Sequence, residues 1–223
     1  MNKIILFLSL LIPSFSMAHA TEDREYFLQK EYYEYIMFES NERIDKYIKE
    51  GLIYQKNEAK FFTVQHLLTQ ICEHYQTKCV PLYLTQEVIE AAAMYPNGVL
   101  VLNENVFNKL NKDELTFLLA HEFGHYYYNH SLKKSHVFAH IIIEQGVFII
   151  DVERTIKMAF ALPGMKNSHH EIEQQADELA IDYLKSKNIK IDCYQFFDNI
   201  VAKEKVSTEQ HKPIKERCSL FNK

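Results

Sequence analysis

The sequence predicts a predominantly helical α+β protein with a small sheet, and three observations lead to this prediction. Apolar residues make up 47% of the 223 positions, which is enough for a substantial core. Glycine and proline occur only 5 times each, so helices are favoured over long flexible linkers. Apolar residues recur at helical spacing in several segments, while two short apolar runs have the composition of strands.

Apolar periodicity places the helices. Residues 24–50 are charged and tyrosine-rich, and their apolar residues have partial helical spacing. Residues 58–75 carry an apolar side chain at every third or fourth position, which is the spacing of a helix. Residues 137–150 are apolar, but a histidine, a glutamate and a glutamine interrupt them, which favours a buried amphipathic helix over a membrane span. The tail beyond residue 203 is polar, and we expect a loop there before a last short helix.

Two short strands are predicted in the middle of the chain. Residues 80–84 form the first, and residues 99–102 form the second after a turn at Pro96, Asn97 and Gly98. The sequence thus divides into a leader over residues 1–20, a helical arm over 21–57 and a main domain over 58–223.

The leader has the pattern of a signal peptide. Lys3 supplies a positive charge, residues 4–12 are apolar, and Ala18 and Ala20 frame a small-x-small cleavage site. A membrane anchor is the alternative, but this apolar run is about half of the roughly 20 residues that span a bilayer. We therefore expect export to the periplasm, or to the medium, with no membrane span in the mature form.

The four cysteines lie beyond this leader. Export to an oxidising compartment favours disulfides, and four cysteines allow three pairings. Proximity in the sequence predicts the pairs Cys72–Cys79 and Cys193–Cys218. None of them forms a CxxC pair, so a structural zinc site made of thiolates is not expected.

The segment HEFGH carries the chemistry. Asn111 and Glu114 form a capping-box pattern that starts a helix before it. On that helix His121 and His125 are about one turn apart, so both imidazoles project from one face and can reach one metal ion. Glu122 is rotated by roughly 100° from His121 and stands beside the metal, where it can act as a general base. The alternative interpretation is a pair of surface histidines that bind no metal.

A third metal ligand must come from elsewhere in the chain. Zinc that catalyses hydrolysis takes three protein ligands and leaves one position open for water. A metzincin would place glycine at position 128 and histidine at position 131, but this chain has Tyr128 and Ser131. That class is therefore excluded.

Helical phase separates the two candidate glutamates further along. Ser168 and Glu171 form a second capping-box pattern, and Glu171 shares a face with polar residues. Glu173 instead shares a stripe with Ala176 and Asp177, where an unpaired carboxylate would be costly to bury. We therefore favour Glu173 as the ligand and Asp177 as the partner of a ligand histidine. The alternative is that this segment is an exposed, acidic helix start, which would give no reason to prefer Glu173 over Glu171 as a ligand.

These residues together resemble the zinc metallopeptidase family that includes HtpX and the CAAX prenyl endopeptidases, which is a gluzincin family. HEFGH followed by Glu173 and Asp177 matches its paired HExxH and ExxxD signatures. Residues 92–101 resemble its strand-forming stretch, although Ala91 stands where asparagine is usual. The resemblance runs over residues 58–220.

The end of the chain resembles the His-Pro-x-x-x-x-Arg pattern of this family. His211 and Arg217 match it, with Lys212 inserted between the histidine and the proline. The resemblance implies that His211 or Arg217 supports the oxyanion formed during hydrolysis. The membrane spans of HtpX and the prenyl endopeptidases are missing, so the chain is more similar to the soluble periplasmic members.

The resemblance also implies a fold and a mode of substrate binding. It implies a mostly helical minigluzincin-like domain with a small antiparallel sheet and one zinc ion per chain. It further implies that an edge strand formed by Val99, Leu100 and Val101 binds extended peptide by strand addition.

Two classes of function are open at this point. The first is an endopeptidase that cleaves unfolded or misassembled exported proteins, with envelope assembly proteins as further partners. The second is a chaperone-like protein of the envelope that binds such chains without cleaving them, while a secreted effector protease would differ from the first only in destination. The net charge of -5, with its charges interspersed, gives no basic surface for nucleic acid.

Overall fold

The computed structural model describes residues 17–87, 91–144, 163–201 and 212–222. The helices are α1 (Met17–Lys49), α2 (Ala59–His74), α3 (Glu104–Lys109), α4 (Lys112–Tyr127), α5 (His130–Glu144), α7 (Pro163–Ser186), α8 (Cys193–Val201) and α9 (Ile214–Ser219), followed by the 3-10 turn η1 (Leu220–Asn222). The strands are β1 (Ile53–Tyr54), β2 (Leu82–Thr85), β3 (Ala92–Met94) and β4 (Leu100–Asn103). The prediction of a mainly helical α+β fold is confirmed.

Some of the predicted segments fall partly or wholly outside these ranges. Most of the predicted signal peptide, residues 145–150 of the predicted apolar helix, and His211 lie outside the described residues. Helix α1 begins within the predicted leader, at Met17. The signal peptide and its cleavage therefore stay predictions.

The small sheet is mixed, whereas a purely antiparallel one was expected. Its strand order is β1-β2-β4-β3. β1 pairs antiparallel with β2 and β3 antiparallel with β4, but β2 and β4 are parallel. The reason is the hairpin formed by β3 and β4, which returns β4 to the position next to β2 and leaves β3 outside.

The expectation of an edge strand at residues 99–101 is wrong. Leu100 and Val101 lie in the central strand β4 and are 0% and 1% exposed, and Val99 before them is buried as well. The predicted turn is present: Gly98 has φ 80 and its amide donates to the carbonyl of Tyr95. This turn folds residues 92–94 back along β4, so β3 becomes the edge.

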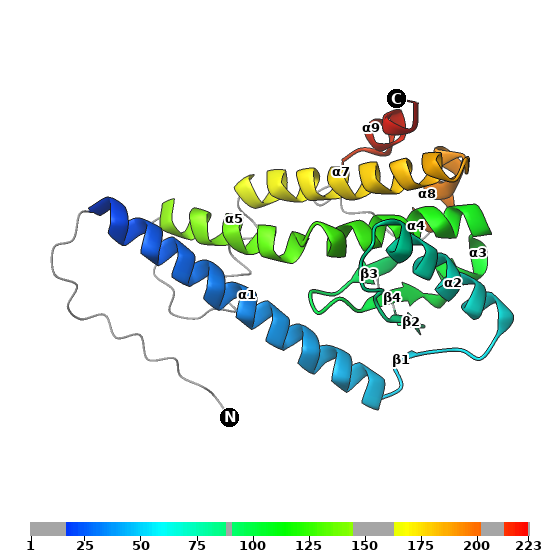
Figure 1. The fold of residues 1–223 in the computed structure, drawn as a ribbon, viewed down its shortest axis with the longest axis horizontal. Helices are drawn as coiled ribbons and strands as arrows, with labels where there is room; N and C mark the ends of the chain where they lie inside the picture. The colour runs from blue at the N-terminus through cyan, green and yellow to red at the C-terminus, as the bar shows by residue number, and fades with distance from the viewer. Residues whose placement is uncertain (1–16, 88–90, 145–162, 202–211, 223) are drawn as a thin grey trace.

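Helix α4 is the centre of the domain (Figure 1). It contacts α7, and it also contacts α2 and β3. Apolar residues lie all around its middle, as expected for a helix enclosed by other elements. The predicted capping box is present, since Asn111 Oδ1 accepts from the amides of Asp113 and Glu114 and Glu114 Oε2 accepts from the Asn111 amide. The start of the HEFGH helix is therefore fixed by local sequence.

Helices α1 and α5 pack against each other (Figure 1). A separate apolar cluster joins them, in which Tyr32 of α1 stacks on Phe138 of α5 with ring centroids 4.1 Å apart. The predicted amphipathic helix over residues 137–150 is found in its described part. None of the helices in the described parts of the chain combines the length and the apolar character that a bilayer span requires.

Both predicted disulfides are present. Cys72–Cys79 joins the end of α2 to the segment that leads into β2. Cys193–Cys218 joins the start of α8 to α9, across a sequence separation of 25 residues. The second bond holds α9 against the main domain, which matters because Arg217 lies on α9.

Candidate metal centre

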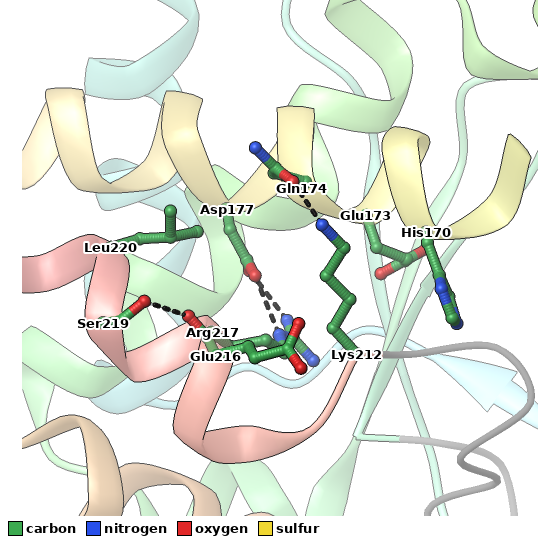
Figure 2. A pocket seen from close by; sticks show the side chains of 9 residues that line it. All are labelled: His170, Glu173, Gln174, Asp177, Lys212, Glu216, Arg217, Ser219 and Leu220. Carbon is green, nitrogen blue, oxygen red and sulfur yellow. Dashed lines mark hydrogen bonds and ion pairs between the residues drawn. The ribbon is translucent and has the colours of Figure 1, made fainter. Parts of the chain in front are cut away.

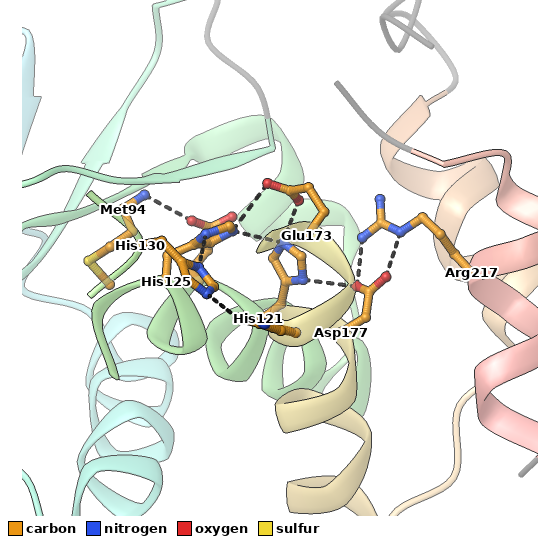
Figure 3. Close-up of polar contacts among 9 residues, drawn as sticks. Met94, His121, His125, His130, Glu173, Asp177 and Arg217 are labelled. Atoms are coloured by element: carbon orange, nitrogen blue, oxygen red, sulfur yellow. Dashed lines mark hydrogen bonds and ion pairs between the residues drawn. The ribbon is translucent and has the colours of Figure 1, made fainter. Parts of the chain in front are cut away.

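Two helices bring three metal-binding side chains together. His121 and His125 project from α4, and Glu173 reaches them from α7 (Figure 3). The two Nε2 atoms are 3.3 Å apart, and Glu173 Oε2 and Oε1 lie 3.3 Å and 3.5 Å from Nε2 of His121 and His125 respectively. Among the described residues, these three form the group of histidine and acidic side chains that could hold a metal ion.

The spacing of these donor atoms fits zinc. Bonds of about 2.0–2.1 Å in a tetrahedral site place neighbouring ligand atoms about 3.3–3.4 Å apart. The Nε2–Nε2 separation of 3.3 Å matches that value, and the two Nε2 atoms lie 3.3 Å and 3.5 Å from different oxygens of Glu173. Two imidazole nitrogens and one carboxylate also form a ligand set of catalytic zinc, which leaves a fourth position open.

A glycine lets the two helices come this close. A Cβ on Gly124 of α4 would lie 3.1 Å from Cα of Ala176 on α7 and 3.4 Å from its Cβ. Because one of these atoms is backbone, the backbone of α7 would have to move by a few tenths of an ångström to make room for it. The small residues at both positions therefore set the distance between the histidines and Glu173.

Gly124→Val is expected to destabilise the protein. The added methyl groups would force α4 and α7 apart, and such overpacking costs about 1–3 kcal/mol. Thermal unfolding should show a clearly lower Tm for Gly124→Val and a smaller decrease for Gly124→Ala. An unchanged Tm for the valine variant would contradict the close approach of the helices.

Glu122 lies beside the three ligands and is 8% exposed. Its Oε2 accepts a hydrogen bond of 2.8 Å from the backbone amide of Met94 in β3. This contact links the predicted general base to the edge strand of the sheet. The side chain is thus held by backbone rather than by a mobile group.

His121 is supported by an acidic residue and a basic residue. Its Nδ1 lies 2.9 Å from Asp177 Oδ1, as predicted for a partner of a ligand histidine. Arg217 donates to both Asp177 oxygens, from Nε at 2.8 Å and from Nη2 at 2.7 Å. The structure therefore places Arg217 against Asp177 as a positioning residue, and the oxyanion role that the family resemblance implies for it stays a prediction.

The two ligand histidines differ in their affinity for protons. Burial would lower the pKa of His121, but hydrogen bonds with Asp177 and Glu173 outweigh it and raise the pKa to about 10. Burial holds the pKa of His125 well below its ordinary value, despite the attraction of Glu173. Burial would also raise the pKa of Asp177, but His121 and Arg217 lower it overall. Without a metal, His125 therefore favours its neutral form, whereas His121 favours its protonated form.

A cavity of about 180 Å³ opens beside these residues (Figure 2). Glu173 and Asp177 line it from α7, together with Gln174 and His170. The opposite wall is formed by α9, by Lys212 two residues before it, and by the start of η1. Lys212 Nζ donates to Gln174 Oε1 over 2.6 Å. This cavity lies between α7 and α9, and Glu173 is the one metal-binding side chain among its lining residues.

The start of α7 differs from the prediction. The helix begins at Pro163, so Ser168 lies within it and does not cap it. Glu171 is nevertheless exposed and Glu173 points to the centre. Helical phase depends only on the spacing of residues within the helix, so it distinguishes the two glutamates wherever the helix begins.

One buried histidine at the centre was not identified from the sequence. His130 Nδ1 lies 2.9 Å from His125 Nδ1. His130 is the first residue of α5, and it follows a turn in which Asn129 has φ 49. Helical phase could not connect the two histidines because this turn separates their helices.

The sequence model of peptidase family M48 matches residues 63–218. This region includes α4, the described part of α7 and Arg217, and so covers every residue of the centre described above. No curated protein sequence matches the chain. The family resemblance noted in the sequence is confirmed by this match.

Proposed function

Because this chain belongs to peptidase family M48, we propose that it is a zinc-dependent endopeptidase that hydrolyses unfolded or misassembled exported proteins. The arrangement of His121, His125 and Glu173 carries the proposal, since one donor atom from each lies within 4.8 Å of the others and the three could share one ion. Glu122 is buried next to them and is held by a backbone amide. Three ligands with a separate carboxylate are what metal-assisted hydrolysis requires.

Each of these residues has a task in the hydrolysis of a peptide bond. His121, His125 and Glu173 hold the zinc ion. When bound, zinc supplies a Lewis acid that polarises the scissile carbonyl and makes water acidic enough to lose a proton near neutral pH. Glu122 takes that proton and delivers it to the leaving amine. The amide of Met94 holds one oxygen of the Glu122 carboxylate, which fixes the position of this side chain.

The outer edge of β3, which pairs with no other strand in the described parts of the chain, is our proposed binding site for the substrate backbone. The amide of Tyr95 and the carbonyl of Ala91 bond to the β4 side of the hairpin, so the backbone polar groups of Ala92 and Met94 point away from β4. The amide of Met94 indeed reaches Glu122. An extended peptide that pairs with this edge would therefore lie alongside the general base, which suits unfolded chains of varied sequence.

We propose that the protein acts in the periplasm, in quality control of envelope proteins. The signal-peptide pattern supports this location, and so do two disulfides, which persist in oxidising compartments. Unfolded polypeptides are the proposed substrates, with envelope assembly proteins as further partners. Fractionation of cells that produce the tagged protein tests the location. Recovery from the medium would favour a secreted effector, and recovery from the cytosol would contradict export.

Removal of metal is expected to abolish proteolysis. The purified protein should degrade denatured casein, lose this activity in a strong chelator, and regain it with one equivalent of zinc per chain. Elemental analysis before and after dialysis gives the zinc content. Cleavage that persists without metal would contradict the proposal, and binding of casein without cleavage would favour the chaperone-like function.

A further inference from the structure

His130 is a buried histidine to which the mechanism above gives no task. It is 2% exposed and lies at the start of α5, next to the metal ligand His125 (Figure 3). The Nδ1 atoms of the two rings are 2.9 Å apart, within hydrogen-bonding distance. The Nε2 atom of His125 faces the metal centre, so His130 contacts the nitrogen that does not bind metal.

Gln175 and Lys133 extend this series of polar contacts beyond His130. His130 Nε2 lies 3.2 Å from Oε1 of Gln175 on α7. Lys133 Nζ donates to the same oxygen over 2.6 Å. Three elements therefore meet here: α4 through His125, α5 through His130 and Lys133, and α7 through Gln175.

With both imidazole rings neutral, the hydrogen bonds in this series run in one direction. Lys133 can only donate, so the oxygen of the Gln175 amide must face it. The same oxygen can only accept, so Nε2 of His130 must carry a proton. Nδ1 of a neutral His130 is then an acceptor, and its partner Nδ1 of His125 must donate. A neutral His125 with its proton on Nδ1 has its lone pair on Nε2, toward the metal centre.

We propose that Lys133, Gln175 and His130 form a positioning relay that fixes the tautomer of His125 and turns its Nε2 lone pair toward the metal. The proposal rests on the proposed function, because it treats His125 as a zinc ligand. Hydrogen bonds to the second nitrogen of a metal-binding histidine hold both the tautomer and the ring orientation. The two ligand histidines thus have different supports, a carboxylate for His121 and an imidazole for His125.

A tyrosine holds the relay in place. The ring of Tyr128 stacks on His130 with centroids 5.6 Å apart and planes at 25°. The Lys133 ammonium lies 5.2 Å from the centroid of the Tyr128 ring, within the range of a cation–π contact. The relay residues are therefore packed as well as hydrogen-bonded, which keeps His130 from rotating away from His125.

Two substitutions at His130 separate hydrogen bonding from packing. Asparagine offers a short acceptor oxygen in place of Nδ1, whereas leucine is apolar and closer to imidazole in volume. Zinc affinity, measured by competition with a chromophoric chelator, should fall about 10–100-fold in His130→Leu and stay near wild type in His130→Asn. His136→Leu, an exposed histidine on the same helix, is the matched control and should change nothing. If leucine retained affinity better than asparagine, packing would explain His130 and the relay would be overturned.

The tautomer itself can be read without metal. Long-range ¹H–¹⁵N correlation spectra of the metal-free protein should show the proton of His125 on Nδ1. Gln175→Glu should preserve this state, because a carboxylate can only accept, while Gln175→Leu should weaken it. A proton on Nε2 of His125 in the wild type would overturn the relay. If the wild type failed to bind zinc, the proposed function would fall, while this spectrum would still decide the relay.

Discussion

Glu122→Gln is expected to abolish proteolysis while leaving zinc bound. A glutamine keeps the shape of the side chain and can still accept the Met94 amide with its oxygen, so the local structure should persist. It cannot take a proton from water, and the loss of a general base lowers rates by about 10²–10⁴-fold. The measurements are kcat/KM on a quenched-fluorescent peptide from a denatured protein, and zinc content by elemental analysis.

An exposed carboxylate nearby provides the control for this variant. Glu178 lies on α7 at the surface, so Glu178→Gln makes the same chemical change away from the centre. It should leave both kcat/KM and zinc content unchanged. Hydrolysis by Glu122→Gln at the wild-type rate would show that another group is the base. Loss of zinc from that variant would show instead that Glu122 helps to bind the metal.

The metal centre could be predicted to a large extent because its parts depend on local spacing. The capping box at Asn111 fixes where α4 begins, and the period of the helix then places His121 and His125 on one side. The same period separates Glu173 from Glu171 on α7. The error in the start of α7 did not affect this result, since phase within a helix is independent of where the helix begins.

The order of the strands and several contacts between elements could not be predicted in this way. β3 is three residues long, too short for a periodic pattern, and its place outside β4 follows from a turn and from packing on α4. The bond from Met94 to Glu122 joins residues 28 positions apart. His130 is close to His125 in sequence, but a turn with Asn129 at positive φ sets their relative orientation. Each of these features depends on how helices and strands pack against one another. The periodicity of a single sequence carries no information about that packing.

The second large effect is expected at the third ligand, in Glu173→Gln. The neutral amide keeps the size of the side chain but removes the charge that lies between His121 Nε2 and His125 Nε2. Loss of a residue that is hydrogen-bonded to a metal ligand lowers metal affinity about 10–100-fold. Loss of a direct ligand should have a larger effect, so zinc affinity should fall more than about 100-fold. Competition with a chelator measures this affinity, and proteolysis at limiting zinc should fall with it.

Glu171→Gln is the matched control, because Glu171 lies two positions earlier on the same helix and is exposed. Both variants remove one negative charge from the same helix. A difference in zinc affinity between them therefore reports on the direction in which each side chain points, and not on the charge of the helix. Normal zinc affinity in Glu171→Gln with a large loss in Glu173→Gln would show that phase on α7 selects the ligand. If both variants lost affinity equally, the charge of the helix rather than coordination by Glu173 would explain metal binding, and the assignment of the third ligand would be wrong.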